Sequence, residues 1–365
     1  MDSCFCSSYR KITSVHSFCT SFKMFFSYRN CIIMLFFALL LVLPFAIVVT
    51  QRAKFSSKTP RKLLDMTKDE KLKFLNSFDL VLSDLDGVLW NQSEDIRGAG
   101  DGFNALKLGG KKVAFVTNNS VRSPKDYVSR FHAAGVDFNP EEMVHPLKSI
   151  IDYLNITKFE GRIYCIANEL FKNSLKEAGY DVIEDPSKLF TESFSELGKY
   201  IFDKEKPSAV IVDVDFNFSG AKFMRAHQYL TRYPDCKYIV GASDKILPIR
   251  PGVEVLGPGR FQDILTQATN RTPIALGKPG LELSELVLQK FDISESSRVL
   301  MIGDMLEQDI GFGKNSNFQT LLVMTGGTKD HDLEDAANRE LIPDFVTTGM
   351  VDFVDFFAEI NSSKI

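Results

Sequence analysis

The chain has 365 residues, of which 44% are hydrophobic and 25% charged, a balance typical of globular proteins and long enough for two domains. The net charge of -4 is unevenly divided, because residues 1–62 hold nine lysines and arginines against one acid, Asp2. The remaining residues then carry 34 basic and 46 acidic side chains, and this acidic composition argues against a nucleic-acid partner.

The first predicted element follows a basic tail of residues 1–30. It is "CIIMLFFALLLVLPFAIVVT", residues 31–50, a run of 20 residues without a charge. A helix of this length crosses about 30 Å of hydrocarbon, so we expect an N-terminal hydrophobic helix that acts as a single transmembrane anchor. Two alternatives remain. One is a cleaved signal peptide, although its apolar core usually spans only about 7–15 residues. The other is an untranslated N-terminus, since Met24 and Met34 are both possible starts.

The orientation of this anchor can be predicted from the charges that flank it. Four basic residues precede the run and six lie between Arg52 and Lys68. The positive-inside tendency therefore places the rest of the chain in the cytoplasm. Only Cys165 and Cys236 follow the run, which indicates no disulfide framework and agrees with a cytoplasmic location. If the N-terminal segment is not translated, we expect a cytoplasmic protein without an anchor.

After a polar linker at residues 51–76, which enters a short helix, apolar runs alternate with amphipathic stretches. Short continuous apolar strands separated by helices predict parallel βαβ units, and hence the α/β class. A Phe-rich helix is expected at residues 350–360. The predicted strands are 80–84, 112–118, 162–167, 208–215, 237–242, 273–277, 298–304 and 319–325, and the predicted helices are 123–135, 168–180, 220–233 and 281–291.

Polar side chains follow four of these strands. In open parallel sheets, ligands bind outside the carboxyl ends of the strands, so we expect these side chains to form one site. They are Asp84 and Asp86 after the first strand, Thr117, Asn118 and Asn119 after the second, Lys278 after residues 273–277, and Asp304 with Asp309 after residues 298–304.

The first strand ends in two carboxylates one residue apart, Asp84 and Asp86. On a continuing strand they would point to opposite faces, but Gly87 lets the backbone turn so that both approach one centre. Their repulsion requires a cation, and a hard divalent ion with oxygen ligands such as Mg²⁺ fits. Asp304 supplies a further anionic ligand, and Asp309 can ligate or orient.

The other polar residues at the strand ends suit a phosphoryl group. Lys278 offers a point positive charge to a phosphoryl oxygen, and the Thr117 hydroxyl with nearby backbone N–H groups suits another. The sequence therefore predicts a site for a metal ion and a phosphate.

Four segments carry a family resemblance: "DLDGVLW", "VTNNS", "GKPG" and "GDMLEQD", in this order. They resemble the four motifs of the haloacid dehalogenase superfamily, over residues ~78 to ~330. "FVTNNS" and the long insertion before "GKPG" are similar to the subfamily of p-nitrophenyl phosphatase, phosphoglycolate phosphatase and pyridoxal phosphatase (chronophin).

The resemblance implies a doubly wound, Rossmann-like parallel-sheet core into which an α/β cap is inserted. The core would comprise residues 77–160 and 273–365, and the cap residues 161–272. Caps of this kind select the leaving group, and related proteins often form homodimers through them.

The resemblance also implies a role for each carboxylate. Asp84 would attack phosphorus to give an aspartyl-phosphate, and Asp86 would protonate the leaving group and then activate water. Asp304 would complete the Mg²⁺ site with Asp84 and the Asp86 carbonyl, with Asp309 in support.

The remaining motif residues would bind the phosphate. Thr117 and Lys278 would hold the phosphoryl oxygens in the transition state, while Asn118 and Asn119 would shape the phosphate loop. The expected function is Mg²⁺-dependent hydrolysis of small phosphomonoesters, with phosphoglycolate, glycerol phosphate and similar metabolites open as substrates. The alternatives are a phosphotransferase or mutase, and a non-catalytic binding or scaffold protein on this fold.

The insertion departs from the family pattern. "VDVDFNFSGAKF" (212–223) resembles a cap segment in which Asp213 replaces the usual glycine and Gly220 an aromatic residue. Pyridoxal phosphatase tends to carry histidine at Asn217, so asparagine there argues against pyridoxal phosphate. Arg260 is either a specificity residue for an anionic substrate or a solvated arginine at a helix start, and Asp244 matches an acid near the substrate. Four histidines after the apolar run show no metal-ligand spacing and are expected on the surface or in packing: His132, His145, His227 and His331.

Overall fold

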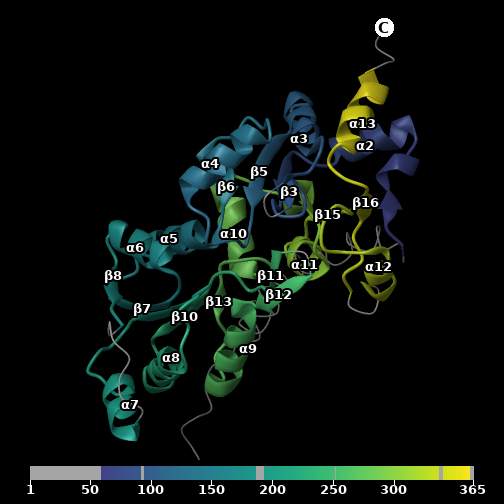
Figure 1. Ribbon diagram of the computed structural model, residues 1–365. Coiled ribbons are helices and arrows are strands. Elements are labelled where there is room, and N and C mark those ends of the chain that lie inside the picture. The colour runs from purple at the N-terminus through teal and green to yellow at the C-terminus, as the bar shows by residue number, and fades with distance from the viewer. Residues whose placement is uncertain (1–58, 92–93, 186–192, 251, 337–339, 362–365) are drawn as a thin grey trace, which may run out of the picture. The chain divides into compact units, whose positions relative to one another are not determined.

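The structure, a computed structural model, describes residues 59–91, 94–185, 193–250, 252–336 and 340–361. These residues form two parallel sheets, each with helices packed on it (Figure 1). The hydrophobic helix expected at residues 31–50 lies outside the described part of the chain. Among the helices that the structure does describe, none combines the length and the apolar character needed to cross a membrane.

The larger sheet has seven parallel strands in the order β1-β16-β15-β14-β2-β5-β6. From β2 the chain proceeds to β5 and β6 on one side, and then through β14, β15 and β16 on the other, which is a doubly wound topology. Both faces of the central strands are buried: Val81 packs into one hydrophobic cluster, and Leu80 and Leu82 pack into another on the opposite face. The α/β class is therefore confirmed. The strands are β1 Arg61–Lys62, β2 Leu80–Ser83, β5 Lys112–Val116, β6 Met143–Val144, β14 Val299–Gly303, β15 Gln319–Val323 and β16 Phe345–Thr347.

Helices cover both faces of this sheet. On one face, α2, α3, α4 and α13 contribute phenylalanines such as Phe103 and Phe353 to the first cluster, and on the other α10 and α11 contribute Val287 and Phe312. The start of α4 is encoded locally, because the Ser123 side chain accepts from the Asp126 N–H and proline occupies the next position. The helices are α2 Lys68–Asn76, α3 Ala99–Leu108, α4 Pro124–Ala133, α10 Leu281–Lys290, α11 Gly311–Asn315 and α13 Asp352–Asn361.

The smaller sheet has five parallel strands in the order β13-β10-β9-β7-β8. Its two faces pack into separate clusters, one that includes Ile150 of α5 and Phe171 of α6, and one that includes Tyr229 of α8 and Leu265 of α9. We call this sheet with these four helices the five-stranded unit. Its elements are α5 Pro146–Ile156, β7 Arg162–Ile166, α6 Glu169–Glu177, β8 Asp181–Ile183, β9 Ala209–Val212, α8 Gly220–Arg232, β10 Lys237–Val240, α9 Pro258–Thr269 and β13 Ile274–Ala275.

The five-stranded unit extends beyond the boundaries expected for the cap. β13 was expected in the second part of the core, but it pairs with β10, and α5 before residue 161 packs on this sheet as well. The reason is that β13 has only two paired residues, so its apolar pattern could not show which sheet it joins.

The segment at residues 59–76 is also more than a linker. β1 pairs with β16 at the edge of the larger sheet, and Leu63 and Phe74 are buried in its first cluster. These residues therefore belong to the folded body.

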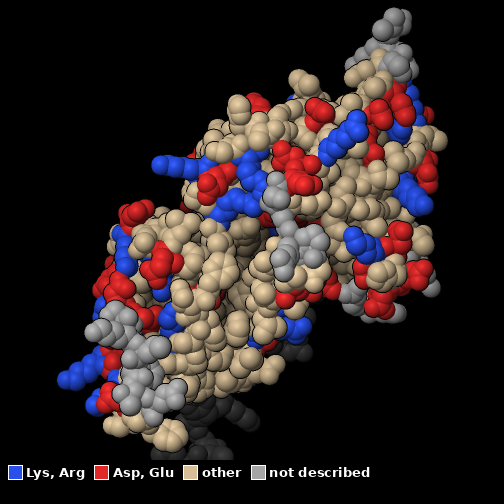
Figure 2. Space-filling view, viewed as in Figure 1, with Lys and Arg blue, Asp and Glu red and all other residues tan. Residues whose placement is uncertain are grey.

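The remaining described elements lie outside the two large sheets. Two antiparallel pairs of strands form small sheets, and α12 is a short helix near the C-terminal end of the chain. On the face shown in Figure 2, acidic and basic side chains of the described residues are interspersed rather than gathered by sign. The elements outside the two large sheets are β3 Trp90–Asn91, β4 Glu94–Asp95, β11 Ile246–Arg250, β12 Val253–Leu256, α7 Phe194–Ile201, α12 Asp330–Ala336 and the short helical turns η1 Leu63–Asp65, η2 Pro140–Glu142, η3 Ser296–Arg298 and η4 Leu306–Ile310.

Candidate active site

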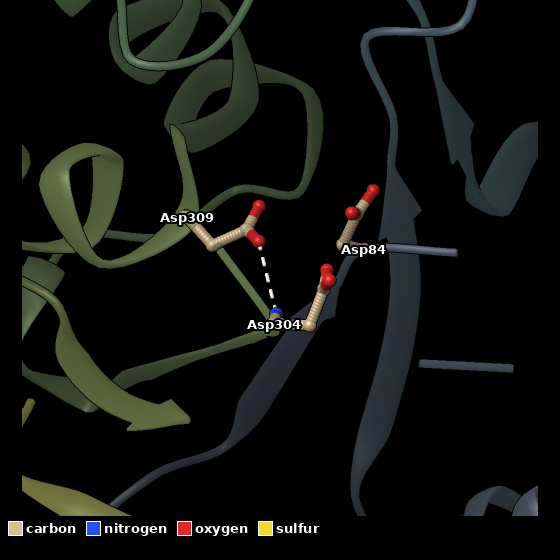
Figure 3. A group of neighbouring side chains, drawn as sticks. All are labelled: Asp84, Asp304 and Asp309. Atoms are coloured by element: carbon tan, nitrogen blue, oxygen red, sulfur yellow. Dashed lines mark hydrogen bonds between the residues drawn. The ribbon is translucent and has the colours of Figure 1, made fainter. Parts of the chain in front are cut away.

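Three carboxylates meet at the carboxyl edge of the larger sheet (Figure 3). Asp84 follows β2, Asp304 follows β14, and Asp309 lies in η4, a single π-helical turn directly after β14. Because β2 and β14 are neighbouring parallel strands, their ends deliver Asp84 and Asp304 side by side. One oxygen from each of the three residues lies within 4.8 Å of the others, so the structure brings together three of the four predicted metal ligands.

The burial of these carboxylates makes their charges costly. Burial raises the pKa of Asp84 well above its usual range, and it raises the pKa of Asp304 to about 7, with the Asp309 charge adding to the effect. The Asp304 Oδ1 atom is buried and has no hydrogen-bond partner among the described residues. A buried oxygen of this kind, beside two other carboxylates, is suited to a divalent cation such as Mg²⁺.

Lys278 enters the cluster from the other side. Its Nζ lies 2.8 Å from Asp84 Oδ1 and 2.6 Å from Asp309 Oδ1, and its side chain is only 2% exposed. Burial alone would lower the pKa of Lys278, but Asp309 and Asp84 raise it above the usual value. Three ionised carboxylates and one ammonium leave a formal charge of -2, which one divalent cation would balance.

Asp309 is held by hydrogen bonds on both of its oxygens. Its Oδ2 accepts from the backbone N–H groups of Asp304 (3.1 Å) and Met305 (2.9 Å), and Oδ1 accepts from Lys278. Of the two roles expected for Asp309, ligand or orienting group, this geometry favours orientation of Asp304 and Lys278.

Glycine is required where the backbone passes this cluster. Gly87 has a φ of +89°, and a Cβ there would lie 2.3 Å from Asp304 Oδ2. Glycine is therefore needed at the turn after Asp86 for two reasons. The backbone there is left-handed, and Asp304 occupies the space that a Cβ would fill.

The Asp86 carboxylate is not part of the cluster. Its Oδ1 accepts from the Trp90 indole N–H at 3.1 Å, and its side chain is 38% exposed. Arg122 lies beside it, with Nη1 3.9 Å from Asp86 Oδ1 and the guanidinium over the rings of Trp90 and Tyr127. The Asp86 side chain is thus open to a reacting group, and only its backbone carbonyl remains a candidate metal ligand. Sequence reasoning missed Arg122, which follows the last residue of the "VTNNS" motif by two positions.

The loop after β5 carries the predicted phosphate-binding residues. The buried Thr117 Oγ1 accepts from the Asn119 N–H at 3.0 Å, and Asn119 Oδ1 accepts from the N–H groups of Val121 and Arg122. Asn118 instead binds Lys278: its Nδ2 donates to the Lys278 carbonyl at 3.0 Å, and its Oδ1 accepts from the Lys278 N–H at 2.8 Å. Asn118 therefore positions the lysine.

The four motifs were expected to follow four strands of one sheet, but the strands belong to two sheets. β2, β5 and β14 are adjacent in the larger sheet, whereas β13, which precedes Lys278, belongs to the five-stranded unit. Lys278 reaches the cluster because the loop after β13 runs beside the loop after β5, where Asn118 binds it.

The remaining sequence candidates lie outside this cluster. Burial raises the pKa of Asp244, and the nearby positive charge of Lys278 opposes this effect. Arg260 is exposed in the first turn of α9, and Asn217 is exposed as well. The four histidines among the described residues are exposed or partly buried, and burial lowers the pKa of His145 to about 4.

Comparisons with known proteins show which family this chain resembles. Residues 81–181 fit the model of a haloacid dehalogenase-like hydrolase family, and residues 275–352 fit a related HAD-hydrolase-like model. Phosphoglycolate phosphatase 2 of Arabidopsis thaliana is 30% identical over 282 residues, which cover 76% of this chain and 93% of that protein. Glycerol-3-phosphate phosphatase of Gallus gallus is 30% identical over 291 residues, 77% of this chain and 92% of that one. The fold is similar to that of p-nitrophenyl phosphatase from Archaeoglobus fulgidus, with a TM-score of 0.64 and 23% identity, over 76% of this chain and 99% of that one.

Proposed function

The chain belongs to the haloacid dehalogenase-like hydrolases, and on this basis we propose that it hydrolyses small phosphomonoesters through a phosphoryl group carried transiently on Asp84. The chain is a phosphoric monoester hydrolase of this family. The observation that carries the proposed mechanism is the buried Asp84 carboxylate, paired with Lys278 beside the unpartnered Asp304 Oδ1.

In the first half of the reaction, an Asp84 carboxylate oxygen attacks phosphorus. The bond from this oxygen to phosphorus forms while the bond from phosphorus to the leaving oxygen breaks. Asp86 gives its proton to that leaving oxygen, and its exposed side chain lies where the leaving group can reach it.

In the second half, water attacks the phosphorus of the aspartyl-phosphate. Asp86, now ionised, takes a proton from the water, and the bond between phosphorus and Asp84 breaks to release inorganic phosphate. Lys278 and the Thr117 hydroxyl bind the phosphoryl oxygens through both steps. Their contribution to catalysis is to position the phosphoryl group and to stabilise its negative charge.

The cation would be held by Asp84 and Asp304, with the Asp86 carbonyl as a third ligand and Asp309 in support. When bound, Mg²⁺ supplies positive charge to the phosphoryl oxygens and to the attacking carboxylate. Lys278 also favours the ionised form of Asp84, which is the form that attacks.

A small phosphorylated metabolite is the proposed substrate, and phosphoglycolate is one candidate because of the similarity to phosphoglycolate phosphatase 2. Glycerol 3-phosphate is an equal candidate, since the similarity to glycerol-3-phosphate phosphatase is of the same degree. A phosphotransferase and a non-catalytic scaffold remain the alternative functions.

The test is p-nitrophenyl phosphate turnover with Mg²⁺ by the purified full chain in detergent. We expect Asp84→Asn to reduce turnover to background. Asp79→Asn is the matched control, because Asp79 lies just before β2 but pairs with Arg298 at the surface. Equal rates for wild type and Asp84→Asn would contradict the proposal. Transfer of the phosphoryl group to an added alcohol, in place of phosphate release, would favour the phosphotransferase.

We also propose that residues 31–50 anchor the chain in a membrane, with the described residues on the cytoplasmic side. The length and the lack of charge of this segment support the proposal. Alkaline carbonate extraction tests it: the full chain should stay with the membrane, and its release would contradict a spanning anchor.

A further inference from the structure

Asp213, at the end of β9, is a buried carboxylate outside the metal cluster. It is 2% exposed, and its three hydrogen-bond donors are all uncharged. Oδ1 accepts from the Ser120 hydroxyl and from the Val214 N–H at 2.6 Å, and Oδ2 accepts from the Ala242 N–H at 2.8 Å. A buried carboxylate is costly unless it is fully hydrogen-bonded, so these donors are required for it to remain ionised.

Ser120 connects Asp213 to the catalytic loop. Ser120 follows Thr117 by three residues. Its side-chain hydroxyl and its backbone carbonyl each form a hydrogen bond with a residue next to the five-stranded sheet. Its hydroxyl donates to Asp213, and its carbonyl accepts from Asn168 Nδ2 at 3.3 Å. The position of the loop therefore depends on the end of β9.

The same network reaches Lys278 by a second route. Next to Ala242, the Ser243 hydroxyl donates to the Lys278 carbonyl at 2.6 Å. Asn118 binds the backbone of the same lysine, and Asn118 lies in the loop with Ser120. The contacts thus close a ring from Ser120 through Asp213, Ser243 and Lys278 back to Asn118.

The ring leaves little room for displacement. A Cβ at Gly241 would lie 1.9 Å from Asp213 Oδ2, and a Cβ at Gly277, just before Lys278, would lie 2.3 Å from the Gly241 carbonyl oxygen. The backbone of Gly241 at the end of β10 is therefore in close contact both with the Asp213 carboxylate and with the backbone that precedes Lys278.

We propose that Asp213 is a positioning residue for phosphoryl transfer, which holds the Thr117 loop and the Lys278 backbone in register through Ser120 and Ala242. This inference rests on the proposed phosphatase function. Glycine, which the family resemblance leads one to expect at this position, would leave the Ser120 hydroxyl and the Ala242 N–H without their acceptor. In this chain, the five-stranded unit is therefore coupled to the catalytic loop by a carboxylate.

The test uses Asp213→Asn, Ser120→Ala and the double variant in the full chain. An asparagine keeps the size of the side chain but replaces one carboxylate oxygen with an NH₂ group. This NH₂ group then faces a backbone N–H, of Val214 or of Ala242, that had donated to the oxygen. We expect each single variant to lower kcat on p-nitrophenyl phosphate about 10- to 100-fold, since small displacements of positioned groups have effects of this size. The double variant should be no slower than the slower single variant, because both break the same contact.

A matched control separates positioning from loss of stability. Asp203 is a partly buried carboxylate of the five-stranded unit that pairs with Arg225 at 2.5 Å, away from the ring. Asp203→Asn should lower Tm and leave kcat unchanged. If Asp203→Asn lowers kcat as much as Asp213→Asn, the effect is general destabilisation and the proposal is wrong.

A second measurement does not depend on turnover. Hydrogen exchange of the backbone amides at residues 117–121 should be at least 10-fold faster in Asp213→Asn than in wild type, and unchanged in Asp203→Asn. Wild-type exchange and wild-type kcat in Asp213→Asn would overturn the proposal. If wild type itself has no turnover, the phosphatase function fails, and the exchange rates still decide whether Asp213 holds the loop.

Discussion

The side-chain amide of Asn118 binds both backbone polar groups of Lys278: Nδ2 donates to the carbonyl at 3.0 Å, and Oδ1 accepts from the N–H at 2.8 Å. The two residues are 160 positions apart and follow strands of different sheets. This pair of hydrogen bonds places the ammonium of Lys278 between Asp84 and Asp309.

Removal of the Asn118 amide should therefore impair catalysis more than stability. We expect Asn118→Ala to lower kcat on p-nitrophenyl phosphate about 10- to 100-fold, because the lysine backbone loses two of its contacts. Asn104→Ala is the control, since Asn104 Nδ2 also donates to a backbone carbonyl, that of Gly135, away from the cluster. A kcat for Asn118→Ala within twofold of that for Asn104→Ala would contradict this role.

Lys278→Met should destabilise the fold as well as stop turnover. It leaves Asp84 and Asp309 buried without their cation, a change that costs about 3–5 kcal/mol for a broken buried ion pair. Denaturant unfolding in the absence of Mg²⁺ measures this cost. The control is Lys245→Met, which removes an exposed pair with Asp263 and should change the free energy of unfolding by less than about 1 kcal/mol. Equal effects of the two substitutions would be inconsistent with the buried pairing.

Gly87→Ala should eliminate Mg²⁺ binding, because its Cβ would overlap Asp304 Oδ2. Gly110→Ala is the control for the strain of placing a side chain on a left-handed backbone. Gly110 has a φ of +81°, but nothing lies within 4 Å of a Cβ there. Gly110→Ala should cost about 1–2 kcal/mol of stability and keep full activity. Isothermal titration with Mg²⁺ compares the two, and tight Mg²⁺ binding by Gly87→Ala would count against the assigned metal site.

The stability of the metal-free protein should fall as pH rises from about 4 to 7. Burial raises the pKa of Asp304 to about 7, whereas an unfolded aspartate titrates near 3.9. The folded state therefore binds the extra proton between these values, and its stabilising effect is present below the lower pKa and lost as pH passes the upper one. Tm measured without metal from pH 5 to 8 should decline, and Asp304→Asn should flatten the decline. Saturating Mg²⁺ should raise Tm more at pH 8 than at pH 5, because only the ionised carboxylate binds the cation. A Tm that rises with pH equally in both proteins would contradict this assignment.

Much of the site follows from the sequence because its signals are local. Asp84 and Asp304 end apolar runs of four or five residues, and runs of this kind are buried parallel strands whose carboxyl ends gather ligands. Lys278 was also expected at this site from its motif, and its Nζ lies 2.8 Å from Asp84 Oδ1. The strand before it was assigned to the wrong sheet, because two paired residues carry too little pattern to identify their neighbours.

The contacts that hold the site together could not be read from the sequence. Asn118 was expected to shape the phosphate loop, but its partner is the backbone of a residue 160 positions away. Arg122 and the contact of Ser120 with Asp213 depend in the same way on how distant segments pack. The unusual aspartate at position 213 was visible as a departure from the family pattern, and only the fold shows what it binds.

The central claim is that Asp84 carries the phosphoryl group, and acid-quenched turnover followed by mass spectrometry tests it most directly. The full chain is mixed with p-nitrophenyl phosphate and Mg²⁺, quenched within the first turnovers, digested, and searched for a phosphorylated aspartate. We predict one phosphoryl group on Asp84, released by hydroxylamine and absent from Asp84→Asn. Sustained turnover with no phosphoryl group on Asp84, or with the group on another residue, would contradict the account.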